Sequence, residues 1–221
     1  MKPDLIVVPF RHGPFWNFSY LLGDAASGEA AVIDPAWDVP AIVQAAAQRE
    51  LRITTALLTH SHSDHAHGVA ELVDLTGATV VTHRLELEGL RRTYTGEVVA
   101  VTSEEWAIGG VPLRLLHTPG HTAGSIAILA GSHLFTGDTL NIGTIGSPGA
   151  EPGLIEALWD TVQATLKPLP DETTIHPGHD AGPTPTATLA DQKARIVALK
   201  VESFAEFVRE VERTTGLRFA R

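Results

Sequence analysis

The chain has 221 residues, which suits a single domain over 1–221 with a sizeable core, and its 43% hydrophobic and 19% charged residues are typical of a soluble globular protein. The formal charge of −10 argues against nucleic acid and anionic membranes as partners. The absence of cysteine excludes disulfides, thiolate ligands and a cysteine nucleophile. No apolar run approaches the roughly 18 residues of a membrane span, and residues 1–4 lack the features of a signal peptide. We expect a cytoplasmic monomer or homodimer that acts on a small molecule.

Predicted strands and helices alternate in the first half of the chain. Asp38 is expected to cap a helix over about 39–49, with Pro40 in its first turn. A second helix is expected from His65 to about Leu75, with Gly77 behind it. Short apolar runs bounded by turn residues predict strands over 5–9, 18–22, 30–33, 54–58 and 79–82.

The second half begins with short strands. The tail over 203–214 is amphipathic, and Ser203 with Glu206 is expected to form a capping box on a helix that packs on the body. The order of elements suggests two similar β/α halves whose sheets pack together with helices outside. The other predicted elements are strands between 98 and 116, a hairpin over 125–135, a long loop over 136–153, a helix over 152–166, a strand over 173–175 and a helix from about 186.

Residues 60–65, His-Ser-His-Ser-Asp-His, place three imidazoles and one carboxylate within six positions. Because side chains alternate along an extended strand end, His60, His62 and Asp64 are expected to point to one side. His65 can swing back toward the same point as the chain turns into a helix. Imidazole suits zinc and iron, and the carboxylate compensates charge. The segment therefore predicts a metal site.

Four more polar residues stand where apolar strands end. His121, Asp138 and His179 each lie beside a glycine in a strand-ending turn, which brings short side chains to a common edge of a sheet. We expect these three residues to complete the metal site. Asp34, between an isoleucine and a proline, is expected to orient a ligand imidazole, with a local Asx-turn as the alternative.

The combined pattern resembles the metallo-β-lactamase superfamily from about residue 17 to residue 191. The resemblance implies an α/β fold, an αββα sandwich with the metals at one sheet edge. It implies two divalent ions, zinc in the first place, with iron or manganese also suited. The implied ligands are His60, His62 and His121 for one ion, Asp64, His65 and His179 for the other, and Asp138 as the bridge between them.

Within the superfamily, the chain looks closest to glyoxalase II-like hydrolases, which act on hydroxyacylglutathione. The common zinc β-lactamases lack a bridging aspartate, and many have a cysteine ligand, whereas this chain has Asp138 and no cysteine. The nucleases of the superfamily carry an added domain for which this chain has no room. The matching segments are 58–60, 118–122, 135–139 and 177–180.

The resemblance implies a metal-dependent hydrolase in which a hydroxide bridging the two ions attacks a carbonyl carbon and the metals stabilise the oxyanion. Asp64 is expected to be catalytic as well as a ligand, because it can orient that hydroxide or take its proton. A thioester suits this chemistry, since a thiol with a pKa of about 8.5 can leave as a thiolate without a strong general acid.

Two departures from glyoxalase II bear on the substrate. The loop over 140–149 has no arginine or lysine, although this loop helps to hold glutathione in that family. The long C-terminal helical domain is also missing, since only about 40 residues follow His179. Shorter bacterial relatives lack that domain too, so the departures weigh against glutathione more than against hydrolysis.

Two other activities remain as alternatives. The first is a mono-iron persulfide dioxygenase, whose iron would be held by His60, His121 and Asp138. Against it, the Tyr that follows the last His-Asp pair in that family is Ala181 here. The second is a lactonase or other ester hydrolase of the same superfamily.

Four residues are predicted to line the substrate pocket. One lies a turn beyond the histidine motif, and three directly follow the expected bridging aspartate. The apolar character of that stretch suggests a substrate less anionic than glutathione. The four are His67, Leu140, Asn141 and Ile142.

Overall fold

The computed structural model describes residues 5–101 and 105–219, and contacts divide the chain into two compact units, Met1–Leu115 and Leu116–Arg221. Residues 1–4, for which we expected no signal peptide, lie outside the described residues, as do 102–104 within the predicted strand region 98–116. Two β/α units are what the order of elements predicted. The treatment of 1–221 as one domain stays a prediction.

The first unit contains a sheet in the order β1-β2-β3-β4-β5-β6. β1, β2 and β3 pair antiparallel, whereas β3, β4, β5 and β6 pair parallel. All predicted strands of this half are present. Their bounds are β1 (Leu5–His12), β2 (Asn17–Asp24), β3 (Glu29–Ile33), β4 (Arg52–Leu57), β5 (Thr79–His83) and β6 (Val98–Val101), and a hairpin of β7 (Glu105–Ile108) and β8 (Val111–His117) follows.

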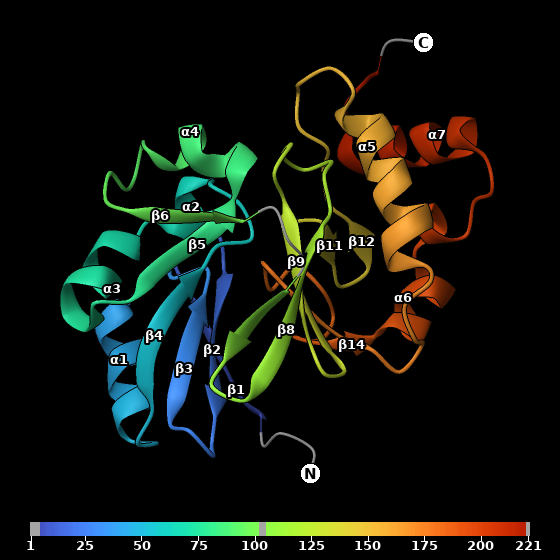
Figure 1. Ribbon diagram of the computed structural model, residues 1–221. Coiled ribbons are helices and arrows are strands. Elements are labelled where there is room, and N and C mark those ends of the chain that lie inside the picture. The colour runs from blue at the N-terminus through green and yellow to red at the C-terminus, as the bar shows by residue number, and fades with distance from the viewer. Residues whose placement is uncertain (1–4, 102–104, 220–221) are drawn as a thin grey trace. The chain divides into compact units, whose positions relative to one another are not determined.

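Helices α1 (Val39–Ala47) and α3 (Val69–Thr76) lie next to β4 in Figure 1. Val39, Ile42 and Leu72 are fully buried in the core cluster that the two helices form with the sheet. This burial of one apolar stripe per helix is what holds helices on a sheet. The remaining helices of the unit are short: α2 (Ser63–Ala66), a 3-10 turn η1 (Arg84–Glu86) and α4 (Leu87–Leu90).

Two helix predictions in this unit need correction. Asp38 does stand at the N-cap of α1, but it adopts a left-handed conformation (φ 50°) and, within the described residues, its side chain makes no capping hydrogen bond. The helix expected from His65 to Leu75 is broken at Gly68 into α2 and α3. A Cβ on Gly68 would lie 2.8 Å from the Pro35 carbonyl oxygen, which accepts the Gly68 N–H at 2.9 Å. That close contact redirects the chain between the two helices.

The second unit contains strands in the order β14-β13-β10-β9, with β10 and β13 parallel. β9 and β10 form the predicted hairpin, in which Ala130 pairs with His133. The two residues of β14 were not predicted, because so short a run carries no periodicity. The bounds are β9 (Ile126–Ala130), β10 (His133–Gly137), β13 (Thr174–Pro177) and β14 (Ala187–Thr188).

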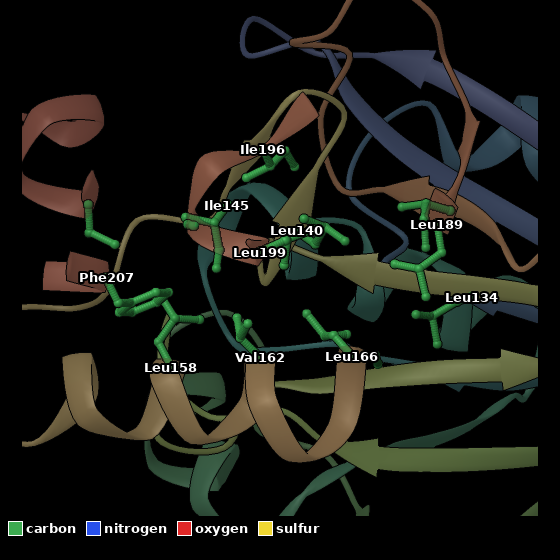
Figure 2. Packing of buried hydrophobic residues seen from close by; sticks show 14 of the residues in the cluster. Leu134, Leu140, Ile145, Leu158, Val162, Leu166, Leu189, Ile196, Leu199 and Phe207 are labelled. Carbon is green, nitrogen blue, oxygen red and sulfur yellow. The ribbon is translucent and has the colours of Figure 1, made fainter. Parts of the chain in front are cut away.

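Helices pack their apolar faces together in this unit (Figure 2). Leu158 lies on α5 (Leu154–Asp160), while Val162 and Leu166 lie on the π-helical continuation η2 (Thr161–Leu166), so the helix predicted over 152–166 is present. Phe207 of α7 (Phe204–Thr215) is fully buried beside them, as expected for a tail that packs on the body. Two further helical segments are α6 (Leu189–Arg195) and the 3-10 turn η3 (Val197–Leu199).

The stretch predicted as a loop over 136–153 contains a small two-stranded sheet, β11 (Leu140–Asn141) with β12 (Thr144–Ile145). Leu140 and Ile145 pair across it, and both are buried in the core of the second unit (Figure 2). Two-residue strands are too short for alternation to be visible in a sequence.

Among the described residues, no helix has both the length and the apolar character needed to cross a membrane.

Replacing Ser203 by Ala is expected to lower the free energy of unfolding by about 1 kcal/mol, the usual cost of losing an N-cap. Ser203 caps α7 as predicted: its hydroxyl accepts the Glu206 N–H at 3.3 Å and donates to the Glu206 carboxylate at 2.9 Å. Urea unfolding of the variant measures the effect. Thr214→Ala, which removes a hydroxyl bonded inside the same helix, is the control, and equal losses in both variants would contradict the capping role.

Candidate metal centre

The carboxyl ends of the parallel strands β3, β4 and β5 bring polar residues of the first unit together. Because such ends meet at one edge of a sheet, Asp34 after β3 and the segment from Thr59 after β4 become neighbours. Oδ2 of Asp34 lies 3.0 Å from Nδ1 of His65 and 2.6 Å from the Thr59 hydroxyl. Asp34 therefore contacts the imidazole of a predicted ligand, as its own predicted role requires.

The backbone of Asp34 is in the left-handed region, with φ 48°. The Ser19 hydroxyl donates to the Asp34 carbonyl oxygen, and the His12 ring nitrogen Nε2 lies 2.9 Å from that hydroxyl. Burial lowers the pKa of His12, while the Asp38 carboxylate partly offsets the effect. The first turn after β3 is thus fixed by hydrogen bonds to its backbone.

His60 and His62 have the spacing of two ligands to one ion. Nε2 of His60 lies 3.1 Å from Nδ1 of His62. Two nitrogens, each about 2.0–2.1 Å from a tetrahedral zinc ion, would lie roughly 3.3 Å apart. His60 is buried, whereas His62 is exposed at the start of α2. The donor set of this loop fits a metal ion.

Asp64 lies in the first turn of α2 and contacts two residues of the first unit. Its Oδ2 is 3.7 Å from Nε2 of His65 and accepts a hydrogen bond from the Asn17 amide at 3.1 Å. Asn17 is fully buried at the start of β2. In the sequence, Asn17 is marked only as a polar residue that opens a buried strand.

Glu86 is a second residue that the sequence did not reveal. It is 3% exposed, and its carboxylate accepts the Ser61 N–H at 2.8 Å, in the middle of the histidine motif. A Cβ on Gly89 would lie 2.2 Å from the Ser61 hydroxyl. The segment after β5 therefore packs directly against the loop that carries His60 and His62.

Three predicted ligands of the second unit come together at Asp138. Oδ2 of Asp138 lies 3.5 Å from Nε2 of His121 and 3.3 Å from Nε2 of His179. One carboxylate oxygen facing two imidazole nitrogens is the arrangement expected of a bridging ligand. The sharing of ions between these three residues and those of the first unit stays a prediction of the motif.

The glycine-rich loop after Asp138 orients His121. Nδ1 of His121 lies 2.8 Å from the Ser147 carbonyl oxygen, which can only accept, so Nδ1 carries the proton and Nε2 is left to bind a metal. Gly149 donates to the Gly120 carbonyl at 3.0 Å, and a Cβ there would lie 2.8 Å from the His121 carbonyl oxygen. A side chain at Gly149 would displace the turn that holds His121.

The four predicted pocket residues have different environments. His67 is exposed and packs on Trp37, with ring centroids 4.6 Å apart. Leu140 and Ile142 are buried in the core of the second unit, which gives both side chains a packing role. Asn141 is only partly buried, and its side-chain oxygen has no hydrogen-bond partner among the described residues. Contact of these four residues with a substrate stays a prediction.

His176 and His133 form a pair in the second unit, with Nε2 of His176 2.9 Å from Nδ1 of His133. Burial, and then the charge of His133, lower the pKa of His176 to about 4, and burial also lowers the pKa of His133. Phe135 stacks on His176 at 4.6 Å. The pair is therefore neutral near pH 7.

The sequence model of the metallo-beta-lactamase superfamily, which describes a protein family, matches residues 13–179 of this chain. A hydroxyacylglutathione hydrolase of Cereibacter sphaeroides is 37% identical over 187 residues, covering 81% of this chain and 68% of the relative. The probable polyketide biosynthesis zinc-dependent hydrolase BaeB of Bacillus velezensis is 26% identical over 197 residues, covering 89% of this chain and 88% of the relative. The crystal structure of ETHE1 from Myxococcus xanthus is 31% identical, with a TM-score of 0.84 over 95% of this chain and 91% of that one.

The chain therefore belongs to the metallo-β-lactamase superfamily and has its mixed α/β fold, as the sequence predicted. Its histidine and aspartate clusters are groups that could hold a metal ion, in keeping with that superfamily.

Proposed function

We propose that this metal-dependent hydrolase of the metallo-β-lactamase superfamily cleaves a thioester. The observation that carries the proposal is the 37% identity to a hydroxyacylglutathione hydrolase over 187 residues, a stretch long enough to include the ligand motifs. Hydrolysis adds water across the bond between the carbonyl carbon and sulfur, and releases a carboxylic acid and a free thiol.

We propose two divalent ions per chain as the cofactors, with zinc in the first place. When bound, such ions activate a water for attack on the carbonyl carbon and polarise the carbonyl oxygen. The residues that would hold them are His60, His62, Asp64, His65, His121, Asp138 and His179.

The tasks of the chain's own residues follow from their contacts. Asp64 would orient the attacking water or take its proton, and the Asn17 amide holds this carboxylate by donating to its Oδ2. Asp138, whose Oδ2 faces both imidazoles of its unit, would be the ligand shared by the ions. Asp34 orients the His65 ring through its Oδ2, which lies 3.0 Å from Nδ1 of that ring.

The substrate need not contain glutathione. The loop over 140–149 carries no basic side chain. The similar protein BaeB, 88% of which is covered by the match, is named as a probable hydrolase of polyketide biosynthesis and not as a glutathione thioester hydrolase. We propose a small acyl thioester as the substrate, turned over in the cytoplasm. The alternative substrate for the same hydrolytic reaction is an ester or a lactone.

The similarity to the ETHE1 structure leaves a second candidate open. This candidate is a mono-iron persulfide dioxygenase, with His60, His121 and Asp138 as the iron ligands. Its requirement for one iron and for oxygen separates it from the hydrolase.

Zinc-loaded protein is expected to contain two ions per chain by elemental analysis and to release free thiol from hydroxyacylglutathione or an acyl thioester of a smaller thiol. A thiol-reactive dye measures the release. One iron per chain, with oxygen consumption on glutathione persulfide, would instead establish the dioxygenase. Turnover of lactones without any thiol release would move the substrate away from thioesters.

A further inference from the structure

We propose that Thr59 is a positioning residue through which Asp34 orients a second ligand: Asp34 holds His65 directly and His60 through the Thr59 hydroxyl. The inference rests on the proposed metal-dependent function, because it concerns which ring nitrogens of the chain face an ion. All four residues belong to the first unit. Their exposed fractions are 2% for Asp34, 1% for Thr59, 1% for His60 and 0% for His65.

Asp34 is surrounded by donors. Its Oδ1 accepts the Thr59 N–H at 2.7 Å, and its Oδ2 lies 2.6 Å from the Thr59 hydroxyl and 3.0 Å from Nδ1 of His65. As an ionised carboxylate, Asp34 only accepts. The hydroxyl must therefore donate its single proton to Asp34, and Nδ1 of His65 must carry a proton.

The hydroxyl oxygen of Thr59 also lies 3.0 Å from Nδ1 of His60. Since the only proton of that hydroxyl is already directed at Asp34, the contact with His60 can form only if Nδ1 of His60 donates. This network assigns the tautomer of His60, with the proton on Nδ1 and a lone pair on Nε2. Nε2 is the nitrogen that faces His62 at 3.1 Å, on the side where a metal would bind.

Burial makes the chain of bonds restrictive. At these exposed fractions, water cannot replace a missing partner, and a buried polar group left without one destabilises its conformation by about 1–3 kcal/mol. The two hydrogen bonds at Asp34 Oδ2 come from different elements, the end of β4 and helix α2. One carboxylate thus fixes the tautomers of two histidines that the motif assigns to different ions.

The arrangement separates the effects of the two residues. Loss of the Asp34 carboxylate should disturb both imidazoles, whereas loss of the Thr59 hydroxyl should disturb His60 alone. An outer partner of a metal ligand typically contributes 10–100-fold to metal affinity. Thr59→Val keeps the shape of the side chain but can neither donate to Asp34 nor accept from His60.

Zinc binding by Thr59→Val is compared with the wild type by competition with a chromophoric chelator. We expect one of the two ions to bind about 10–100-fold more weakly and the other to be unchanged. Thr59→Ser, which retains the hydroxyl, should stay near wild-type affinity. Thr82→Val is the matched control, because Thr82 is also fully buried in the first unit and its hydroxyl bonds only the Leu58 carbonyl among its recorded hydrogen bonds.

A second readout needs no metal. Long-range ¹H–¹⁵N spectra of metal-free wild type should show His60 protonated on Nδ1, and this preference should be lost in Thr59→Val. If Thr59→Val does not fold, Thr59→Ala removes the hydroxyl without placing an extra methyl beside the carboxylate. Wild-type zinc affinity and an unchanged His60 tautomer in the valine or alanine variant would overturn the proposal that Thr59 positions His60. A wild type that shows the predicted tautomer but binds no zinc would instead overturn the proposed function.

Discussion

Asp138→Asn is expected to lose bound metal and to hydrolyse its substrate at least about 100-fold more slowly than the wild type, because the residue is a predicted ligand and even outer partners of ligands contribute up to that factor. Oδ2 of Asp138 lies within 3.5 Å of Nε2 of both His121 and His179. Asparagine has the same shape, but it lacks the negative charge and turns one of the two oxygens into a donor group. The charge that would hold two cations close together is then missing.

Metal content by elemental analysis and the rate of thiol release are measured on the same preparation of the variant. Asp171→Asn is the matched control, since Asp171 lies in the same unit but forms an exposed ion pair with Lys193 at 2.7 Å. Such a pair contributes little to stability. The control should keep both metals and the full rate. Normal metal content together with a normal rate in Asp138→Asn would rule out its role as a bridge.

The strands were predictable from short runs rich in aliphatic and β-branched residues. β3 (EAAVI) is nearly continuous in hydrophobic residues, whereas β4 (RITTAL) and β5 (TVVTH) mix buried aliphatic residues with threonine, which also favours strands. Once strands are placed, the polar residues that follow them fall at one edge of the sheet. Asp34 and His60 could therefore be selected from the sequence alone.

Residues that act through tertiary hydrogen bonds escaped prediction. Glu86 meets the histidine motif through the Ser61 N–H, and no sequence pattern records a carboxylate bonded to a main-chain group 25 positions away. Asn17 reaches Asp64 from the beginning of another strand, 47 positions earlier. Thr59 is adjacent to His60, but its role depends on which way a single hydroxyl proton points. Such contacts arise from tertiary packing, which local sequence does not encode.

The helix boundaries failed for a related reason. Gly68 lies inside an Ala/Val/Leu pattern that predicts one continuous helix, and only its contact with the Pro35 carbonyl breaks the helix there. Asp38 has the residue type of an N-cap, yet its backbone is left-handed and its side chain makes no capping hydrogen bond among the described residues. At Gly68 a contact between segments overrides a local preference.

Lowering the pH from about 6.5 to about 4 is expected to destabilise the metal-free protein through His176. Burial and the nearby His133 lower the pKa of His176 from 6.5 to about 4 in the folded chain. Between these two pKa values the unfolded chain binds more protons than the folded chain, so the free energy of unfolding falls as the pH falls. This stability is fully present above about pH 6.5. At about 1.4 kcal/mol per tenfold change in proton affinity, the loss is at most about 3.5 kcal/mol.

Urea unfolding of EDTA-treated wild type and His176→Gln at several pH values between 7 and 4 tests this linkage, and the chelator removes the separate effect of protons competing with metal for the ligands. Glutamine does not titrate but can still hydrogen-bond His133, so the variant should show a shallower loss of stability toward acid. His117→Gln is the control, because the imidazole of His117 is exposed and bonds the Ala123 carbonyl at 2.9 Å. If wild type and His176→Gln lose stability in parallel as the pH falls, His176 is not the group that couples proton binding to folding.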